Sequence, residues 1–98
     1  MKVRYADSRL ERLERDLGFT AGFGEIVVRA FRKRMQFIRA AKDERDFHAL
    51  KSLHYEKLKG KRAHQRSMRL NRQWRLVLEI SKDVDGNVVV VVSIEDYH

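Results

Sequence analysis

The sequence of 98 residues contains no cysteine and no proline. The first absence excludes disulfide bonds and thiolate metal ligands, and the second means that no turn is fixed by a pyrrolidine ring. No apolar run approaches the roughly 18–20 residues that cross a bilayer, and Met1–Tyr5 lack the apolar stretch of a secretory signal. We therefore expect a single domain, residues 1–98, that lies in the cytoplasm and has no membrane partner.

Several common catalytic and binding motifs are also missing. The sequence has no glycine-rich phosphate loop, no nucleophile elbow, and no helix-turn-helix pattern with a basic recognition helix. The four histidines are scattered along the chain and the acidic residues show no ligand spacing. The sequence therefore indicates no metal site and no other cofactor, and it argues against a repressor that reads DNA directly.

Acidic residues are scarce in one segment. The net charge of the chain is +8, and residues 50–75 carry nine basic side chains against a single acid, Glu56. Residues 76–98 reverse this balance, with Lys82 against five acids. Charge that serves only solubility tends to mix both signs, whereas this segment does not. An excess of one sign within one segment favours a surface that binds a polyanion such as RNA.

Hydrophobic periodicity predicts two helices in the first half of the chain. Ser8 and Glu11 fit a capping box, and leucines then recur at helical spacing until Gly18. A longer helix is predicted over residues 25–42, and Asp43 is placed to cap a further short turn. The apolar stripe of the longer helix comprises Val27, Phe31, Met35, Ile38 and Ala41.

The second half shows the alternation of apolar and polar residues that is typical of strands. Residues 66–70 and 74–80 alternate and are joined by a short loop, and the valine run at 88–92 fits a central strand. Val3–Tyr5 would form a short first strand. Because the helices precede most of the strands, we expect an α+β fold with two N-terminal helices on one face of a mostly antiparallel sheet of about four strands.

The expected strand pairing brings like charges together. If Leu70 pairs with Trp74, Arg69 lies directly across from Arg75, which destabilises a sheet unless an anion lies between them. A two-residue turn at Asp85-Gly86 would pair Ile80 with Val91 and put Glu95 on the face that carries Trp74. We expect a longer or bulged turn instead. The residues of the last strand that would then face the helices are Val90, Val92 and Ile94.

The last residues provide groups for proton transfer. RNA is cleaved without a metal when its 2′-hydroxyl attacks the adjacent phosphate, which requires a base, an acid and cations. An arginine suits the cationic role because its planar fork matches phosphate oxygens and keeps its charge. The sequence supplies several arginines and ends in Tyr97 and His98.

The order of several short motifs resembles the HigB-type toxins of the RelE superfamily, closely over residues 58–98 and only in layout over the N-terminal half. The motifs are Leu58-Lys59-Gly60-Lys61-Arg62, Ser67-Met68-Arg69-Leu70-Asn71, Gln73-Trp74-Arg75-Leu76 and Asp96-Tyr97-His98. The resemblance implies a microbial-RNase-like fold and metal-independent cleavage of messenger RNA in the ribosomal decoding site. It also implies a cognate helix-turn-helix antitoxin, HigA-like, that neutralises the toxin and represses the shared operon, so that operator DNA is contacted only indirectly.

The same resemblance assigns roles to individual residues. Tyr97 and His98 match the terminal catalytic pair of the family, and Asp96 matches the acid before them. Arg75 matches the arginine that stabilises the phosphate, and Lys59 matches a phosphate contact. The residues expected to bind RNA are Lys59, Lys61, Arg62, Arg66, Arg69 and Arg72.

The general base stays open at this point. Some members of the family have a catalytic histidine at the position where this chain has Glu56. Glu56 could accept a proton, although a carboxylate also repels phosphate, and His54 and His98 are the alternatives. A non-catalytic RNA- or ribosome-binding module is the competing function, because the basic segment alone would suffice for it.

Overall fold

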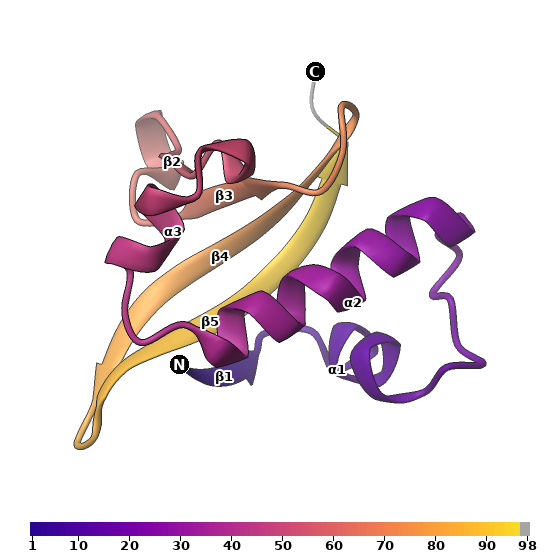
Figure 1. Ribbon diagram of the computed structural model, residues 1–98, viewed down its shortest axis with the longest axis horizontal. Helices are drawn as coiled ribbons and strands as arrows, with labels where there is room; N and C mark the ends of the chain where they lie inside the picture. The colour runs from indigo at the N-terminus through magenta and orange to yellow at the C-terminus, as the bar shows by residue number, and fades with distance from the viewer. Residues whose placement is uncertain (97–98) are drawn as a thin grey trace.

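The computed structural model describes residues 1–96, in which a five-stranded sheet with strand order β1-β5-β4-β3-β2 carries the helices on one face (Figure 1). Four strand pairs hold the sheet together, and only the one between β1 and β5 is parallel. The elements in chain order are β1 (Lys2–Tyr5), α1 (Ser8–Arg15), α2 (Glu25–Ala40), α3 (Arg45–Ala49), η1 (Lys51–Leu53), β2 (Glu56–Lys57), η2 (Gly60–Arg62), β3 (Arg66–Arg69), β4 (Trp74–Asp83) and β5 (Gly86–Asp96).

The predicted fold class is confirmed. Helices α1 and α2 share one hydrophobic core with the inner face of the sheet, and the sheet is mostly antiparallel. The strand count is five rather than about four, because β2 also joins the sheet through Glu56 and Lys57. A strand of two exposed polar residues shows no alternation from which it could be predicted. Within residues 1–96, no helix is both long and apolar enough to cross a membrane.

Both main helices form where the periodicity places them, with different ends. Helix α1 is capped by Asp7 rather than Ser8, since the Asp7 carboxylate accepts the backbone N–H of Arg9 at 2.9 Å. An aspartate at this position also interacts favourably with the helix dipole. The helix ends at Arg15, so Leu17 lies beyond it and is exposed. Every residue of the stripe predicted for the longer helix is buried.

The β4–β5 hairpin corrects the expected register. Its turn contains only two residues, Val84 and Asp85, and closes tightly because Gly86 adopts a φ of 118°. The irregularity lies within the strand instead, where Val92 is the extra residue of a bulge. The strand residues in the core are consequently Val89, Val91 and Ile94, so the expectation is right for Ile94 and wrong for Val90 and Val92.

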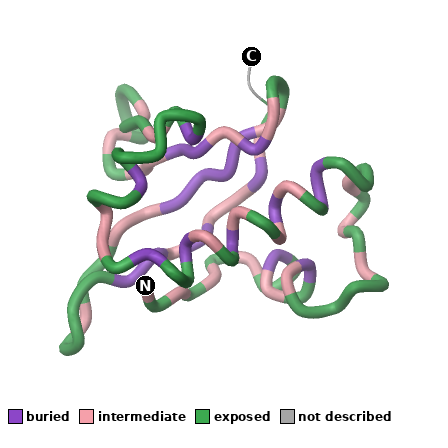
Figure 2. Tube along the Cα trace, viewed as in Figure 1, coloured by how far each residue is buried: buried purple, intermediate pink, exposed green. Residues whose placement is uncertain are grey.

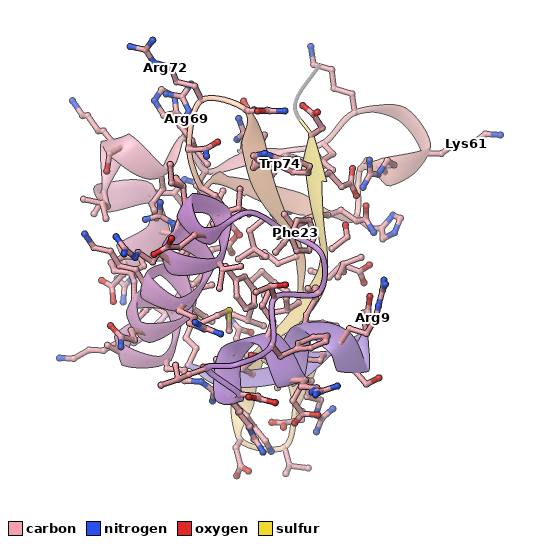
Figure 3. The ribbon with its side chains drawn as sticks, turned by 90° about the vertical axis from the view of Figure 1, so that its right-hand side faces the viewer. Arg9, Phe23, Lys61, Arg69, Arg72 and Trp74 are labelled. Carbon is pink, nitrogen blue, oxygen red and sulfur yellow. The ribbon has the colours of Figure 1, made fainter. Side chains whose placement is uncertain are left out.

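Most of the buried residues lie on the inner face of the sheet and on the facing side of α2 (Figure 2), and α1, α3 and η1 add a few more. At one end of this core, the Phe23 and Trp74 rings meet edge to face with centroids 5.7 Å apart (Figure 3). This contact attaches the α1–α2 connection to the start of β4. Trp74 therefore packs with the core, as its alternation with Leu76 and Leu78 indicates.

A polar cluster joins β1 to both main helices. Glu14 of α1 accepts hydrogen bonds from the Tyr5 hydroxyl and from Nε and Nη2 of Arg39, the latter two at 2.7 and 2.9 Å. The Arg39 hydrogen bonds lower the pKa of the Glu14 carboxyl. Burial, and then the hydrogen bond to Glu14, raise the pKa of Tyr5.

Replacing Glu14 with glutamine is expected to make stability less dependent on pH. A carboxyl whose pKa is lowered by folding contributes stability above its ordinary pKa of about 4.3 and loses that contribution as the pH falls through the folded value. At pH 7, Glu14→Gln should therefore lower stability by about 1 kcal/mol, or roughly 4–8 °C in Tm. The difference from the unmodified protein should disappear in strong acid.

Thermal melts monitored by circular dichroism between pH 3 and 7 test this. The control is Glu25→Gln, which removes an exposed ion pair with Arg29 on α2 and should change Tm little. A Tm of Glu14→Gln that lies below the Tm of the unmodified protein by the same amount at every pH would contradict the interpretation.

Candidate active site

Arg75, the second residue of β4, is a buried charged side chain on the face of the sheet away from the helices, with 5% of its surface exposed. Its Nε donates to the Ser67 hydroxyl at 2.9 Å, and its Nη2 donates to the His54 backbone carbonyl at 2.7 Å. The same Nη2 lies 3.2 Å from Oε1 of Glu56. A buried guanidinium requires acceptors of this kind, and they fix its orientation.

The pairing of the strands explains how these groups meet. Arg69 lies directly across from Arg75, which confirms the predicted hairpin register. On the other side, Glu95 of β5 is the partner of Arg75, and Glu56 of β2 is the partner of Ser67. The two glutamates therefore bring negative charge to this part of the sheet, where Glu56 contacts Arg75 directly.

A pocket of about 160 Å³ opens on this face of the sheet. Arg75 and Arg62 bring two guanidinium groups to its wall, and Glu95 adds a carboxylate. The complete lining comprises Leu58, Arg62, Ser67, Arg75, Val77, Glu95 and Asp96. A small pocket whose lining includes two arginines has the chemistry to hold a phosphate group.

Arg62 reaches the pocket from η2 and is held by Glu95. Its Nη1 and Nη2 donate to Oε1 and Oε2 of Glu95 at 2.9 and 2.6 Å, and its Nε donates to Gln65 at 2.9 Å. Glu95 also accepts the Ser93 hydroxyl at 2.6 Å. The hydrogen bond from Arg62 lowers the pKa of the Glu95 carboxyl, and Glu95 raises the pKa of Arg62.

The residues predicted to be catalytic are distributed unevenly. Arg75 and Glu56 are in contact, whereas His54 contributes its carbonyl to Arg75 and is exposed, with a left-handed φ of 46°. Asp96 lines the pocket and accepts a hydrogen bond from the side chain of Gln73 at 3.1 Å. The predicted terminal pair, Tyr97 and His98, lies outside the described residues.

The residues predicted to bind RNA do not form one patch. Lys61 projects on one side of the sheet end, and Arg69 and Arg72 lie on the other, at the β3–β4 turn (Figure 3). Lys59 is exposed next to η2. Arg66 points to the helix side instead, where its Nε is 3.8 Å from Glu44 and its Nη1 donates to backbone carbonyls.

Two residues of the site were not predicted from the sequence. Ser67 was recognisable only as a polar residue on the outer face of a strand, and its burial follows from the pairing of β2. Glu95 was not predicted as a site residue, because its contact with Arg62 joins residues 33 positions apart in the sequence and leaves no local signal. Among residues 1–96, no three histidine or carboxylate side chains are grouped so that they could hold a metal ion.

Comparison with known proteins relates the chain to a family. A family model described as RelE-like toxin of type II toxin-antitoxin system HigB matches residues 4–98. The chain belongs to the HigB-like toxin family. No curated protein matches the chain.

Three solved structures are similar in fold to this HigB-like toxin. The YoeB/ParE toxin from Agrobacterium tumefaciens is 22% identical, with 100% of both chains covered and a TM-score of 0.61. YafQ from E. coli strain BL21(DE3) is 9% identical, with 97% of this chain and 91% of that chain covered and a TM-score of 0.59. The RelBE2 toxin-antitoxin complex from Mycobacterium tuberculosis is 14% identical, with 98% and 96% covered and a TM-score of 0.50.

Replacing Ser67 with alanine is expected to destabilise the toxin. The substitution removes the acceptor of the Arg75 Nε–H inside the protein, and a buried donor that loses its partner costs about 1–3 kcal/mol. Urea unfolding measures the loss, with Ser81→Ala as the matched control because Ser81 is an exposed serine of β4. Equal stability of the two variants would show that Ser67 does not hold Arg75.

Proposed function

We propose that this HigB-like toxin is a ribosome-dependent endoribonuclease that cleaves messenger RNA by attack of the 2′-hydroxyl on the adjacent phosphate, without a metal. The observation that carries the proposal is the buried, fully oriented Arg75 in a small pocket, in contact with the carboxylate of Glu56. Cleavage of messenger RNA under translation would inhibit protein synthesis in the cytoplasm.

Arg75 is suited to stabilise the charge that develops on the phosphate. Its orientation is set before substrate binds, by the Ser67 hydroxyl and the His54 carbonyl. A buried cation that needs no reorganisation stabilises a transition state more than a mobile surface charge does. Arginine is preferable to lysine because a planar guanidinium keeps its charge and can be held by several protein acceptors at once.

Glu56 is the general base in this proposal. Its side chain is 52% exposed and can therefore reach a ribose, while its contact with Arg75 offsets the repulsion between a carboxylate and phosphate. His54 is the weaker candidate, because its described contact with Arg75 uses the backbone carbonyl. His98, assisted by Tyr97 and Asp96, is assigned as the acid that protonates the departing 5′-oxygen. That assignment rests on the sequence resemblance.

The proposed partners follow from the charge distribution and the family. Lys59, Lys61, Arg69 and Arg72 would contact the backbone of messenger RNA or of ribosomal RNA around the decoding site. We further propose a HigA-like, helix-turn-helix antitoxin that neutralises the toxin and connects it to operator DNA. The similarity of fold to a toxin that forms the RelBE2 complex supports an antitoxin partner.

Primer extension on messenger RNA translated by purified ribosomes tests the proposal. The intact toxin should produce new 5′ ends at defined codon positions. Deletion of His98 and Arg75→Lys should each abolish them, the latter because lysine keeps the charge but loses the fork. Glu56→Gln should slow cleavage by a factor of about 10²–10⁴, as expected for loss of a general base.

Glu25→Gln, at the first residue of α2 and outside the lining of the pocket, is the control and should cut at the normal rate. Normal cutting by Glu56→Gln would move the base to His54 or His98. Ribosome binding without any cleavage by the intact protein would favour the non-catalytic RNA- or ribosome-binding module.

A further inference from the structure

The pocket contains two arginines that differ in how firmly they are held. Arg75 is buried, and its contacts include the Ser67 hydroxyl of β3 and the backbone carbonyl of His54, at the end of η1. The side chain of Arg62 is 46% exposed, and both of its terminal nitrogens are engaged by Glu95, whose side chain is 37% exposed. Exposed ion pairs contribute little to stability and are exchanged readily with other ions.

The geometry of the Arg62–Glu95 contact resembles that of an arginine bound to phosphate. Each terminal nitrogen of Arg62 faces one oxygen of the carboxylate, at 2.9 and 2.6 Å. The same two-point contact is made to phosphate oxygens, so that carboxylate and phosphate compete for one fork. Glu95 therefore occupies the position that a phosphate oxygen pair would take.

The charges of the pocket show the consequence of this occupation. Arg62 and Arg75 provide two positive charges, and their contacts with Glu95 and Glu56 bring two negative charges to them. Asp96 adds another carboxylate to the pocket wall. A phosphate that enters therefore meets little net attraction until one carboxylate moves away. Movement of Glu95 frees both terminal nitrogens of an arginine, because both Nη1 and Nη2 of Arg62 donate to it.

We propose that Arg62 forms a second phosphate subsite beside Arg75, and that Glu95 is a displaceable counter-ion that occupies it until an RNA phosphate takes its place. This inference rests on the proposed function. The ligand is a phosphodiester next to the one held by Arg75. Displacement of Glu95 offsets part of the binding energy of the phosphate. An isolated anion gains nothing to compensate for this cost, whereas an RNA chain is also bound elsewhere by lysine and arginine side chains. The subsite therefore favours RNA over an isolated anion.

Binding of an uncleavable RNA to the full-length protein tests the inference. The probe is a single-stranded oligonucleotide with 2′-O-methyl riboses, and its affinity is measured by fluorescence anisotropy over a range of KCl concentrations. Glu95→Gln should bind about two- to fivefold more tightly at low salt, the factor that corresponds to an exposed ion pair. Its plot of log affinity against log salt should be steeper by up to about 0.7. In the unmodified protein, the freed Glu95 carboxylate takes up a cation from solution when RNA binds Arg62, and this uptake offsets the cation that the RNA phosphate releases. Glutamine takes up no cation, so the release is seen in full.

Two further variants separate this effect from general electrostatics. Asp85→Asn makes the same change in net charge at the opposite end of the β4–β5 hairpin and should alter affinity much less. In an Arg62→Gln background, the Glu95→Gln substitution should give no gain, because the fork that it frees is absent.

An equal gain in Asp85→Asn and Glu95→Gln, or a gain that persists without Arg62, would overturn the inference. Weaker binding by Glu95→Gln would also overturn it, because Glu95 would then position Arg62 for RNA. These results leave the nuclease proposal intact if the unmodified protein still cleaves translated messenger RNA. If the unmodified protein neither binds the oligonucleotide nor cleaves, both proposals fail together.

Discussion

The burial of the Arg75 guanidinium is the constraint on which the outer face of this toxin depends. A charged group with 5% of its surface exposed must find acceptors within the protein. Ser67 provides one from the neighbouring strand, and the chain before β2 provides another by turning through the left-handed conformation at His54, which directs its carbonyl to Arg75. The Arg75 side chain therefore helps to fix the path of the short segment from η1 to β2, together with the buried Leu53.

The two faces of the sheet are specialised in different ways. The inner face is apolar and packs against α1 and α2, so that it stabilises the fold in the manner of an ordinary core. The outer face carries the arginines and glutamates of the pocket, where attraction within each pair balances the cost of desolvation. Because strand residues alternate between the faces, β4 serves both purposes with Leu76 on one side and Arg75 on the other.

The bulge at Val92 connects these two specialisations. An extra residue in β5 keeps Ile94 in the core together with Val91, although the two are three positions apart. The same shift places Glu95 on the outer face, directly across from Arg75 and within reach of Arg62. A regular strand would place Glu95 on the inner face and leave Arg62 without this carboxylate. The bulge therefore allows Ile94 to enter the core and Glu95 to reach the pocket at the same time.

The sequence by itself determined the α+β class, the buried stripe of α2 and the β3–β4 hairpin that sets Arg69 against Arg75, because these follow from periodicity and short-range pairing. Its resemblance to the HigB-type toxins was confirmed over residues 4–98. Only the tertiary structure decided that Arg75 is buried, that the His54 backbone carbonyl accepts a hydrogen bond from it, and that Glu95 binds the guanidinium group of Arg62. These contacts join residues that are distant in the chain, and they depend on a two-residue strand and on a bulge. Neither feature leaves a periodic signal in the sequence, because both arise from pairing between strands rather than from local alternation.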